Sequence, residues 1–279
     1  MKPITKITAS LLTLTSLLTV IPPTLSTPLP KDSETPISTS QTEEALLNQQ
    51  QYLQFLPELK ALQQIPFSEL TQEQRLRLNE LVALQQELRH SFNEFIDRPD
   101  IREATRQLRQ SSSGSTLALE DLSSLQDNLA NLQQSTVLLS PLILDDRLEL
   151  ILVTPDAPPL RRTVEVNAAD LNQTISKFRQ VLQSPNQDPL PSAQQLYQWL
   201  IAPFENELAQ LNTEAIIFSP DRSLRYIPLA ALHDGDQWLV ERFTLNTITS
   251  AGLTNFDTAP TATPRLLLAG FTEGIADVY

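Results

Sequence analysis

The chain has 279 residues, of which 33 are acidic and 20 are basic, so its net charge is −13. This balance argues against a nucleic-acid-binding protein, which needs a basic face to displace counterions from phosphates. The chain contains no cysteine, which excludes both disulfides and a thiol nucleophile within these 279 residues. Its 41% hydrophobic content is enough for a packed core in one or two domains.

Residues 1–26 have the pattern of a secretory signal peptide. Lys2 and Lys6 form a positive start, Ile7 to Ile21 an apolar stretch, and Thr24-Leu25-Ser26 a cleavage site with small residues. We therefore expect export to the periplasm or the extracellular space. The alternative is an uncleaved membrane anchor, and apart from this segment we expect no membrane contact.

Residues 27–42 are polar and proline-rich, which predicts a disordered linker. Residues 43–134 then follow a helical pattern, in which Pro57 is expected to kink or end the first helix. Thr71 and Gln74 predict a capping box that opens a long helix reaching Ile96. Shorter helices are expected at 101–110 and after Asp121. A helical hairpin or coiled-coil-like bundle that contacts a protein partner is one interpretation, and a solvated helical surface is the other.

From residue 135 the periodicity changes to that of strands. We expect antiparallel strands at Thr136–Leu139, Leu148–Val153 and Arg162–Val166. Helix 168–182 should be capped by Asn167 and should bury one apolar stripe (Leu171, Ile175, Phe178 and Leu182). A further helix is expected to begin with Ser192 as its cap and to be interrupted at Pro203.

The stretch 215–240 has the most distinctive pattern. Residues 215–218 (AIIF) predict a strand buried on both faces, and Pro220-Asp221 predict a turn after it. An extended segment through Leu224, Tyr226 and Ile227 should follow, then a short helix opened by Pro228. Asp234-Gly235 predict a second turn, and residues 238–240 (WLV) a further strand.

This pattern resembles the CHAT domain, a bacterial caspase-like module. The resemblance is carried by Pro220-Asp221, Leu224, Ile227-Pro228, Ala231-Leu232 and Asp234-Gly235, and continues to Ser250-Ala251. It implies that residues 135–279 are the first part of a caspase-like α/β domain with a mainly parallel, incomplete sheet and flanking helices. Residues 265–270 are expected to form one more strand of that sheet.

The resemblance also implies a cysteine peptidase whose histidine lies in an H-G motif and whose cysteine lies in an S-A-C-like motif. Neither motif occurs in this sequence. We therefore expect a truncated reading frame or fragment that is inactive as a cysteine peptidase. We assign no catalytic, cofactor-binding or metal-binding residue, and we expect no cofactor.

Several residues are of types that can take part in catalysis or binding. His233 is interpreted as a solvent-facing structural residue of the turn, and His90 as part of a solvated helix face. A triad of Ser219, His233 and Asp221 is conceivable but lacks a G-x-S-x-G motif. Arg222 and Arg225 suit either acidic groups of a ligand or pairing at the surface. Two histidines far apart and no cysteine argue against a zinc site.

The sequence thus predicts an exported CHAT-domain protein whose complete form would be a caspase-like cysteine peptidase acting on protein partners. The alternative is a non-enzymatic scaffold, or pseudopeptidase, that uses its helical region for protein–protein interaction. A third hypothesis is an α/β domain that binds a small molecule.

Overall fold

The computed structural model describes residues 39–111 and 122–248, all of which belong to one compact unit, Thr39–Tyr279. The predicted signal peptide, most of the predicted linker, Ser250-Ala251 and the predicted strand at 265–270 lie outside the described residues. The boundary predicted between residues 134 and 135 stays a prediction.

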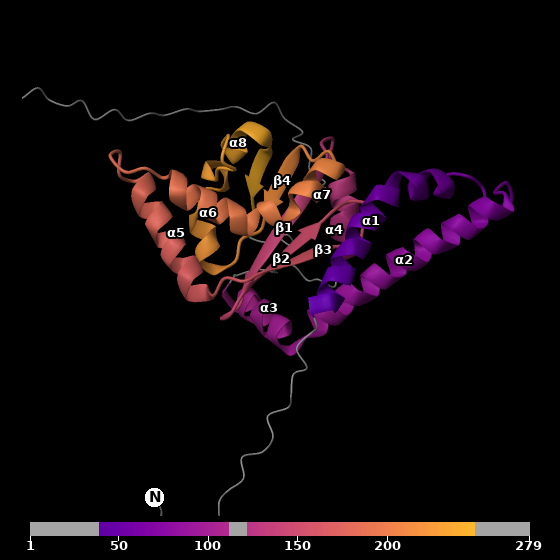
Figure 1. The fold of residues 1–279 in the computed structure, drawn as a ribbon, viewed down its shortest axis with the longest axis horizontal. Coiled ribbons are helices and arrows are strands. Elements are labelled where there is room, and N and C mark those ends of the chain that lie inside the picture. The colour runs from indigo at the N-terminus through magenta and orange to yellow at the C-terminus, as the bar shows by residue number, and fades with distance from the viewer. Residues whose placement is uncertain (1–38, 112–121, 249–279) are drawn as a thin grey trace, which may run out of the picture. The chain divides into compact units, whose positions relative to one another are not determined.

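A five-stranded sheet forms the centre of the fold (Figure 1). Its order is β3 (Leu160–Val164), β2 (Leu148–Val153), β1 (Thr136–Ile143), β4 (Ala215–Phe218) and β5 (Thr244–Thr247). The first three strands pair antiparallel, whereas β4 is parallel to both β1 and β5. The α/β class is confirmed, but the sheet is mixed rather than mainly parallel, because two of the four strand pairings described, β1 with β2 and β2 with β3, are antiparallel.

Successive side chains of each strand point to opposite faces, and both faces are covered. One face packs against α5 (Ala168–Leu182), α6 (Leu190–Leu200), α7 (Glu205–Gln210) and α1 (Thr39–Gln63). The other packs against the end of α2 (Gln72–Asp97), α3 (Pro99–Ser111) and α4 (Leu122–Ala130). In β4, Ile216 and Phe218 face the first layer and Ile217 the second. This confirms that the strand is buried on both sides.

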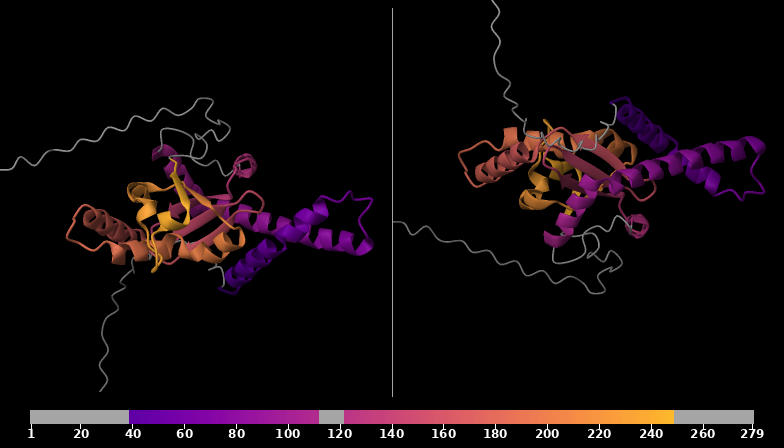
Figure 2. Two further views of the ribbon diagram at one scale, coloured as in Figure 1. Left: turned by 90° about the horizontal axis from the view of Figure 1, so that it is seen from above. Right: turned by 90° about the horizontal axis from the view of Figure 1, so that it is seen from below.

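The helices before the sheet begin with a hairpin in which α1 and α2 run side by side (Figures 1 and 2). The predicted capping box is present: the Thr71 hydroxyl accepts from the Gln74 N–H at 3.2 Å, and the Gln74 side chain accepts from the Thr71 N–H at 2.9 Å. Helix α1 continues through Pro57 to Gln63, so of the two predictions for this proline, a kink or an end, the end is wrong. Packing of the buried Leu53, Leu56 and Leu59 into the core accounts for this continuity.

Two details of the later helices differ from expectation. Asn167 caps α5 as predicted, but Val181 is buried in place of Leu182, which is 40% exposed at the end of the helix. Helix α6 begins at Leu190, with Pro191 in its first turn, so Ser192 lies buried inside the helix and is not its cap. Pro203 interrupts the path as predicted, in the 3₁₀ turn η2 (Ala202–Phe204). Among the described residues, no helix combines the length and apolar character needed to cross a bilayer.

Candidate functional site

The turn after β4 lies at the carboxyl end of the two central parallel strands, where α/β proteins commonly bind ligands. Strand β4 ends its pairing with the Ser219 N–H, which donates to the Leu139 carbonyl at 2.9 Å. Beyond that point β1 continues through Pro141, which has no N–H to donate, and then Ile143. The Asp221 Oδ2 atom accepts from the Ile143 N–H at 3.0 Å. A carboxylate therefore replaces the missing β4 backbone as acceptor for β1.

Asp221 is 2% exposed. Burial raises its pKa above the ordinary value of 3.8, against the opposing effects of the Ile143 N–H and the charges of Arg222 and Arg225. Its second oxygen, Oδ1, is buried, and among the described residues it has no hydrogen-bond partner; the same holds for Ser223 Oγ in the same turn. The turn after β4 thus contains two buried polar groups, the Asp221 carboxylate and the Ser223 hydroxyl.

After Asp221 the chain forms the 3₁₀ helix η3 (Arg222–Tyr226), so the expectation of an extended segment was wrong. The Leu224 N–H donates to the Asp221 carbonyl at 2.9 Å, and the Leu224 side chain is fully buried. Arg222, at the start of η3, has φ 40°, a left-handed conformation that is costly for a residue with a β-carbon. The buried Asp221 before it and the buried Leu224 two residues after it fix the chain on both sides of Arg222.

The exposed side of η3 carries arginine and tyrosine. Arg222 Nη2 donates to Gln107 Oε1 of α3 at 2.7 Å, and Arg225 Nε donates to the Pro220 carbonyl at 3.3 Å. Tyr226 is 64% exposed, and the Arg179 guanidinium of α5 lies 5.0 Å from the centre of its ring. Arg222 and Arg225, which were predicted at the surface, thus lie near Arg179 and Tyr226, which the sequence did not mark as candidates for a site.

The second turn of the motif begins after η4 (Leu229–Ala231), the short helix expected from Pro228. Gly235 has φ 121°, and Asp234 Oδ1 accepts from the N–H groups of residues 236 and 237 at 2.8 Å. His233 is 8% exposed, so its expected solvent-facing position was wrong. Its Nδ1 accepts from the Gly235 N–H at 2.9 Å, and its ring meets Trp238 edge to face at 4.7 Å. The imidazole is a structural part of the turn.

The predicted strand at 238–240 is instead the short helix α8 (Leu239–Arg242), which precedes β5. The Trp238 N–H donates to Glu241 Oε2 at 2.7 Å and so starts this helix. Arg242 then joins two elements, with nitrogens 2.9 Å from Glu205 Oε2 and 3.1 Å from Asp234 Oδ2. The α8 turn is therefore fastened to the start of α7.

The structure does not assemble the conceivable triad. Asp221 binds the backbone of Ile143 and His233 that of Gly235. Ser219 uses its N–H to close the β4 ladder. His90 is exposed and lies 3.3 Å from Glu94 one turn further on, as its assignment to a solvated helix face requires. Among the described residues, no group of three or more His, Cys, Asp or Glu side chains is arranged to hold a metal ion.

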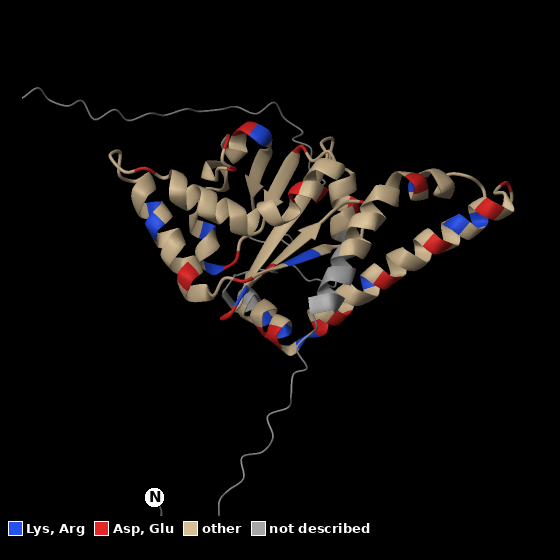
Figure 3. Ribbon diagram, in the orientation of Figure 1, with Lys and Arg blue, Asp and Glu red and all other residues tan. Residues whose placement is uncertain are grey.

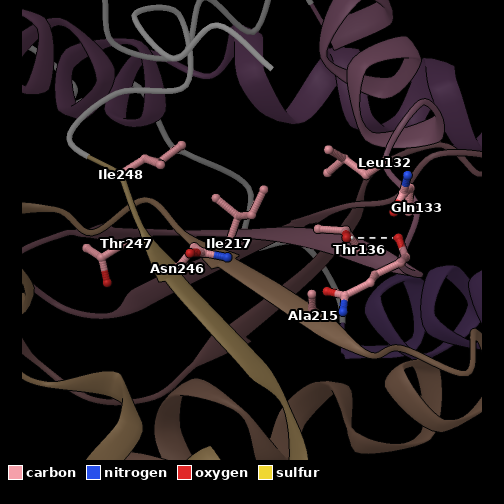
Figure 4. A pocket seen from close by; sticks show the side chains of 9 residues that line it. Leu132, Gln133, Thr136, Ala215, Ile217, Asn246, Thr247 and Ile248 are labelled. Carbon is pink, nitrogen blue, oxygen red and sulfur yellow. Dashed lines mark hydrogen bonds between the residues drawn. The ribbon is translucent and has the colours of Figure 1, made fainter. Parts of the chain in front are cut away.

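A separate hollow of about 530 Å³ lies on the α4 side of the sheet, beside β4 and β5 (Figure 4). Ile217 and Asn246, which are paired in register, lie next to each other in its wall, with Thr136 further along. The lining residues carry no charge; they are Leu132, Gln133, Gln134, Thr136, Ala215, Ile217, Asn246, Thr247 and Ile248. No sequence signal identified this hollow, because it depends on which part of the sheet the helices leave open.

Asp221 is the residue whose role sequence reasoning missed. The sequence marked it as a turn former, but its main partner, Ile143, lies 78 positions earlier in the chain. A proline in β1 at the point where β4 stops is the signal that could have suggested a side-chain substitute.

The comparisons with known proteins were made for the whole chain. No curated protein matches its sequence. A solved structure described as a PilM-PilN type IV pilus biogenesis complex is 21% identical, over 46% of this chain and 40% of that chain, with a TM-score of 0.21. At this TM-score the similarity carries no argument about fold or function. The family model described as the CHAT domain matches residues 190–272. That range contains every residue on which the resemblance was based, and this part of the chain is similar to the CHAT domain.

Proposed function

We propose that this chain is an exported CHAT-domain protein that acts on other proteins, and that the 279 residues alone have no cysteine peptidase activity. The observation that carries the proposal is the CHAT match over residues 190–272 in a chain without cysteine. In its complete form the module would cleave a peptide bond with a thiolate that a histidine activates.

The site chemistry supports the inactive part of the proposal. Nucleophilic catalysis requires a nucleophile within hydrogen-bond reach of a base that is free to take its proton. In the family-like stretch the imidazole of His233 already accepts a backbone N–H and packs against Trp238. The Oδ2 atom of Asp221 accepts from the Ile143 N–H of β1, and its Oδ1 atom is buried without a partner among the described residues.

A peptidase assay tests this part. The purified chain, incubated with a mixed pool of fluorogenic peptides, should show no cleavage that iodoacetamide abolishes. The nucleotide sequence following the Tyr279 codon should then be read. An H-G and S-A-C pair in the same frame would favour the peptidase, and its absence would favour the scaffold. Thiol-sensitive cleavage by the homogeneous chain would contradict the proposal.

Export is supported by the charge and hydrophobicity pattern of residues 1–26. Expression of the full chain in a bacterium, followed by cell fractionation and amino-terminal sequencing, tests it. We expect a periplasmic or secreted protein that begins at Thr27. An unprocessed protein in the membrane fraction would indicate the anchor instead.

The alternative, a scaffold, is favoured by apolar side chains on the α1–α2 hairpin. Phe67 is 63% exposed and Leu76 60% exposed, and the Arg75 guanidinium lies 5.0 Å from the Phe67 ring. If this end of the hairpin binds a partner, the double variant Phe67→Ser/Leu76→Ser should lose the complex formed with wild type without a lower melting temperature. Val240→Ser, at a residue that is 57% exposed on α8, is the matched control.

A further inference from the structure

Two segments of this acidic protein carry basic residues without acidic ones between them. From Leu171 to Gln187 the sequence contains Lys177 and Arg179 and no Asp or Glu, and from Arg222 to His233 it contains Arg222 and Arg225 and again no Asp or Glu. The two segments are α5 and the η3 region, which pack together. In a chain of net charge −13, this local excess of positive charge requires an explanation.

The fold brings three arginines and a tyrosine from these segments to one surface, which we call the arginine patch: Arg179, Arg222, Arg225 and Tyr226. The Arg179 guanidinium lies 5.0 Å from the Tyr226 ring centre, and Arg222 and Arg225 lie on the same short helix as Tyr226. Basic positions are coloured blue on the ribbon of α5 in Figure 3. The patch adjoins the carboxyl end of β4, next to the Asp221 turn.

Three arginines elsewhere on the surface each lie beside a carboxylate. Arg77 is 3.0 Å from Glu58, Arg102 is 2.8 Å from Asp97, and Arg106 is 2.6 Å from Glu103. In contrast, among the described residues no carboxylate lies within 4.0 Å of the Arg179 guanidinium, which rests on an aromatic ring.

Arg222 differs from those arginines as well. Its Nη2 binds the neutral amide of Gln107, and its nearest carboxylate is the buried Asp221, 3.8 Å from Nε. Arg179 and Arg222 therefore differ from these arginines: the first has an aromatic ring as its neighbour, and the second has a neutral amide and a carboxylate at 3.8 Å.

The backbone beneath the patch is held in place before any ligand arrives. Leu224 is fully buried under η3, Asp221 is tied to β1, and Arg222 is kept in a left-handed conformation. Strained backbone that the surrounding structure maintains is often found at binding sites. A surface that needs no ordering loses less free energy on binding.

We propose that the arginine patch binds an acidic, Asp- or Glu-rich segment of a partner polypeptide. Guanidinium groups bind carboxylates through paired N–H donors, and the exposed Tyr226 ring offers apolar contact to the neighbouring side chain. At about 0.1 M salt the Debye length is about 10 Å, so more distant acidic residues of the protein are screened and the patch dominates locally. That the ligand is a polypeptide rests on the proposed function; the charge complementarity does not.

Binding of a short fluorescein-labelled peptide of alternating glutamate and serine, followed by fluorescence anisotropy, tests the proposal. The double variant Arg179→Gln/Arg222→Gln should weaken binding about three- to tenfold, as expected for the loss of two partly exposed ion pairs. Both side chains are exposed, and unchanged circular dichroism and melting temperature would show that the variant folds. Tyr226→Ala should weaken binding by a smaller factor.

The matched control is Arg102→Gln/Arg106→Gln on α3, which removes the same charge from arginines that already have carboxylate partners. It should leave the affinity unchanged. Equal weakening by both double variants, or tighter binding of a single-stranded oligonucleotide of equal charge, would overturn the proposal. The measurement needs no catalysis, so its failure would leave the peptidase assay result as it stands.

Discussion

The two halves of the sheet are stabilised in different ways. The antiparallel half contains buried charges: Glu149 is fully buried and lies 2.7 Å from Arg147 Nε, and Arg162 pairs with the buried Glu207 of α7. The parallel half contains the apolar β4, with the carboxylate of Asp221 beyond its end. The difference suggests that hairpin strands can use charged helix partners, whereas a central parallel strand depends on apolar packing from both sides.

The parallel half should respond most strongly to loss of volume. Phe218→Ala removes a fully buried ring from β4 and should lower the free energy of unfolding by about 3–5 kcal/mol. Urea denaturation followed by tryptophan fluorescence measures this. Tyr226→Ala, at an exposed aromatic residue, is the control and should change stability by less than about 1 kcal/mol. An equally small effect of Phe218→Ala would contradict the apolar description of this half.

The antiparallel half should respond most strongly to loss of charge. Glu149→Ala leaves Arg147 and Arg161 without their buried partner and should cost about 3 kcal/mol, since breaking a buried pair strands the remaining charge. Glu103→Ala removes an exposed partner of Arg106 and should cost less than about 1 kcal/mol. Urea denaturation at equal ionic strength compares them. Similar effects of the two substitutions would show that the buried network adds no stability.

Asp221 and Asp100 should give the two halves opposite pH responses. The pKa of Asp221 in the folded state is raised above 3.8. The stability of wild type relative to Asp221→Asn should therefore fall as the pH rises from 3.8 to this raised pKa. Burial also opposes ionisation of Asp100, but hydrogen bonds from Arg147 and Arg98 outweigh it and lower its pKa. The advantage of wild type over Asp100→Asn should therefore be complete above pH 3.8 and be lost as pH falls further.

Chemical denaturation of the two variants across acidic pH measures both slopes. Asp221→Ala is the control for the hydrogen bond itself: it removes the acceptor of the Ile143 N–H and should cost about 1–3 kcal/mol, whereas Asn keeps an acceptor. Slopes of the same sign for Asp221→Asn and Asp100→Asn would contradict the assigned pKa directions.

The smallest expected effect is a gain in stability. Arg222→Gly places at φ 40° a residue without a β-carbon and should stabilise the protein by up to about 0.5–1 kcal/mol. The higher entropy that glycine gives the unfolded chain reduces this gain. Thermal unfolding measures it. Arg225→Gly, in the same η3 helix without positive φ, should destabilise the protein; a lower melting temperature for both variants would argue against backbone strain at Arg222.

The parts of this fold that depend on near neighbours could be predicted from the sequence. The caps at Thr71 and Asn167 each involve a partner three residues away, and the β4 run is apolar on both faces. The predictions failed where a specific side-chain contact opposed the general propensity of the segment. Trp238-Leu239-Val240 have high strand propensity, but Glu241 reaches back to the Trp238 N–H and the chain forms a helical turn. His233 was expected in solvent, because the sequence does not show its contact with Trp238. That contact forms only when the turn between the two residues closes.

The candidate site shows the same division. Pro220-Asp221 and Asp234-Gly235 were recognisable as turns, because proline, aspartate and glycine act through their own backbone. Only part of the arginine patch, Arg222 and Arg225, could be named from the sequence. Arg179 lies on a different helix, and no local pattern links it to them.

Pro141 has a consequence for how this family-like stretch can vary. Two extra residues in β4 would meet a position of β1 that offers no donor, and would displace the carboxylate that serves Ile143. Insertions between Phe218 and Asp221 should therefore be poorly accommodated, whereas the exposed loop between α5 and α6 has no such constraint. The length of β4 is thus limited by Pro141, which lies 77 residues before the end of that strand.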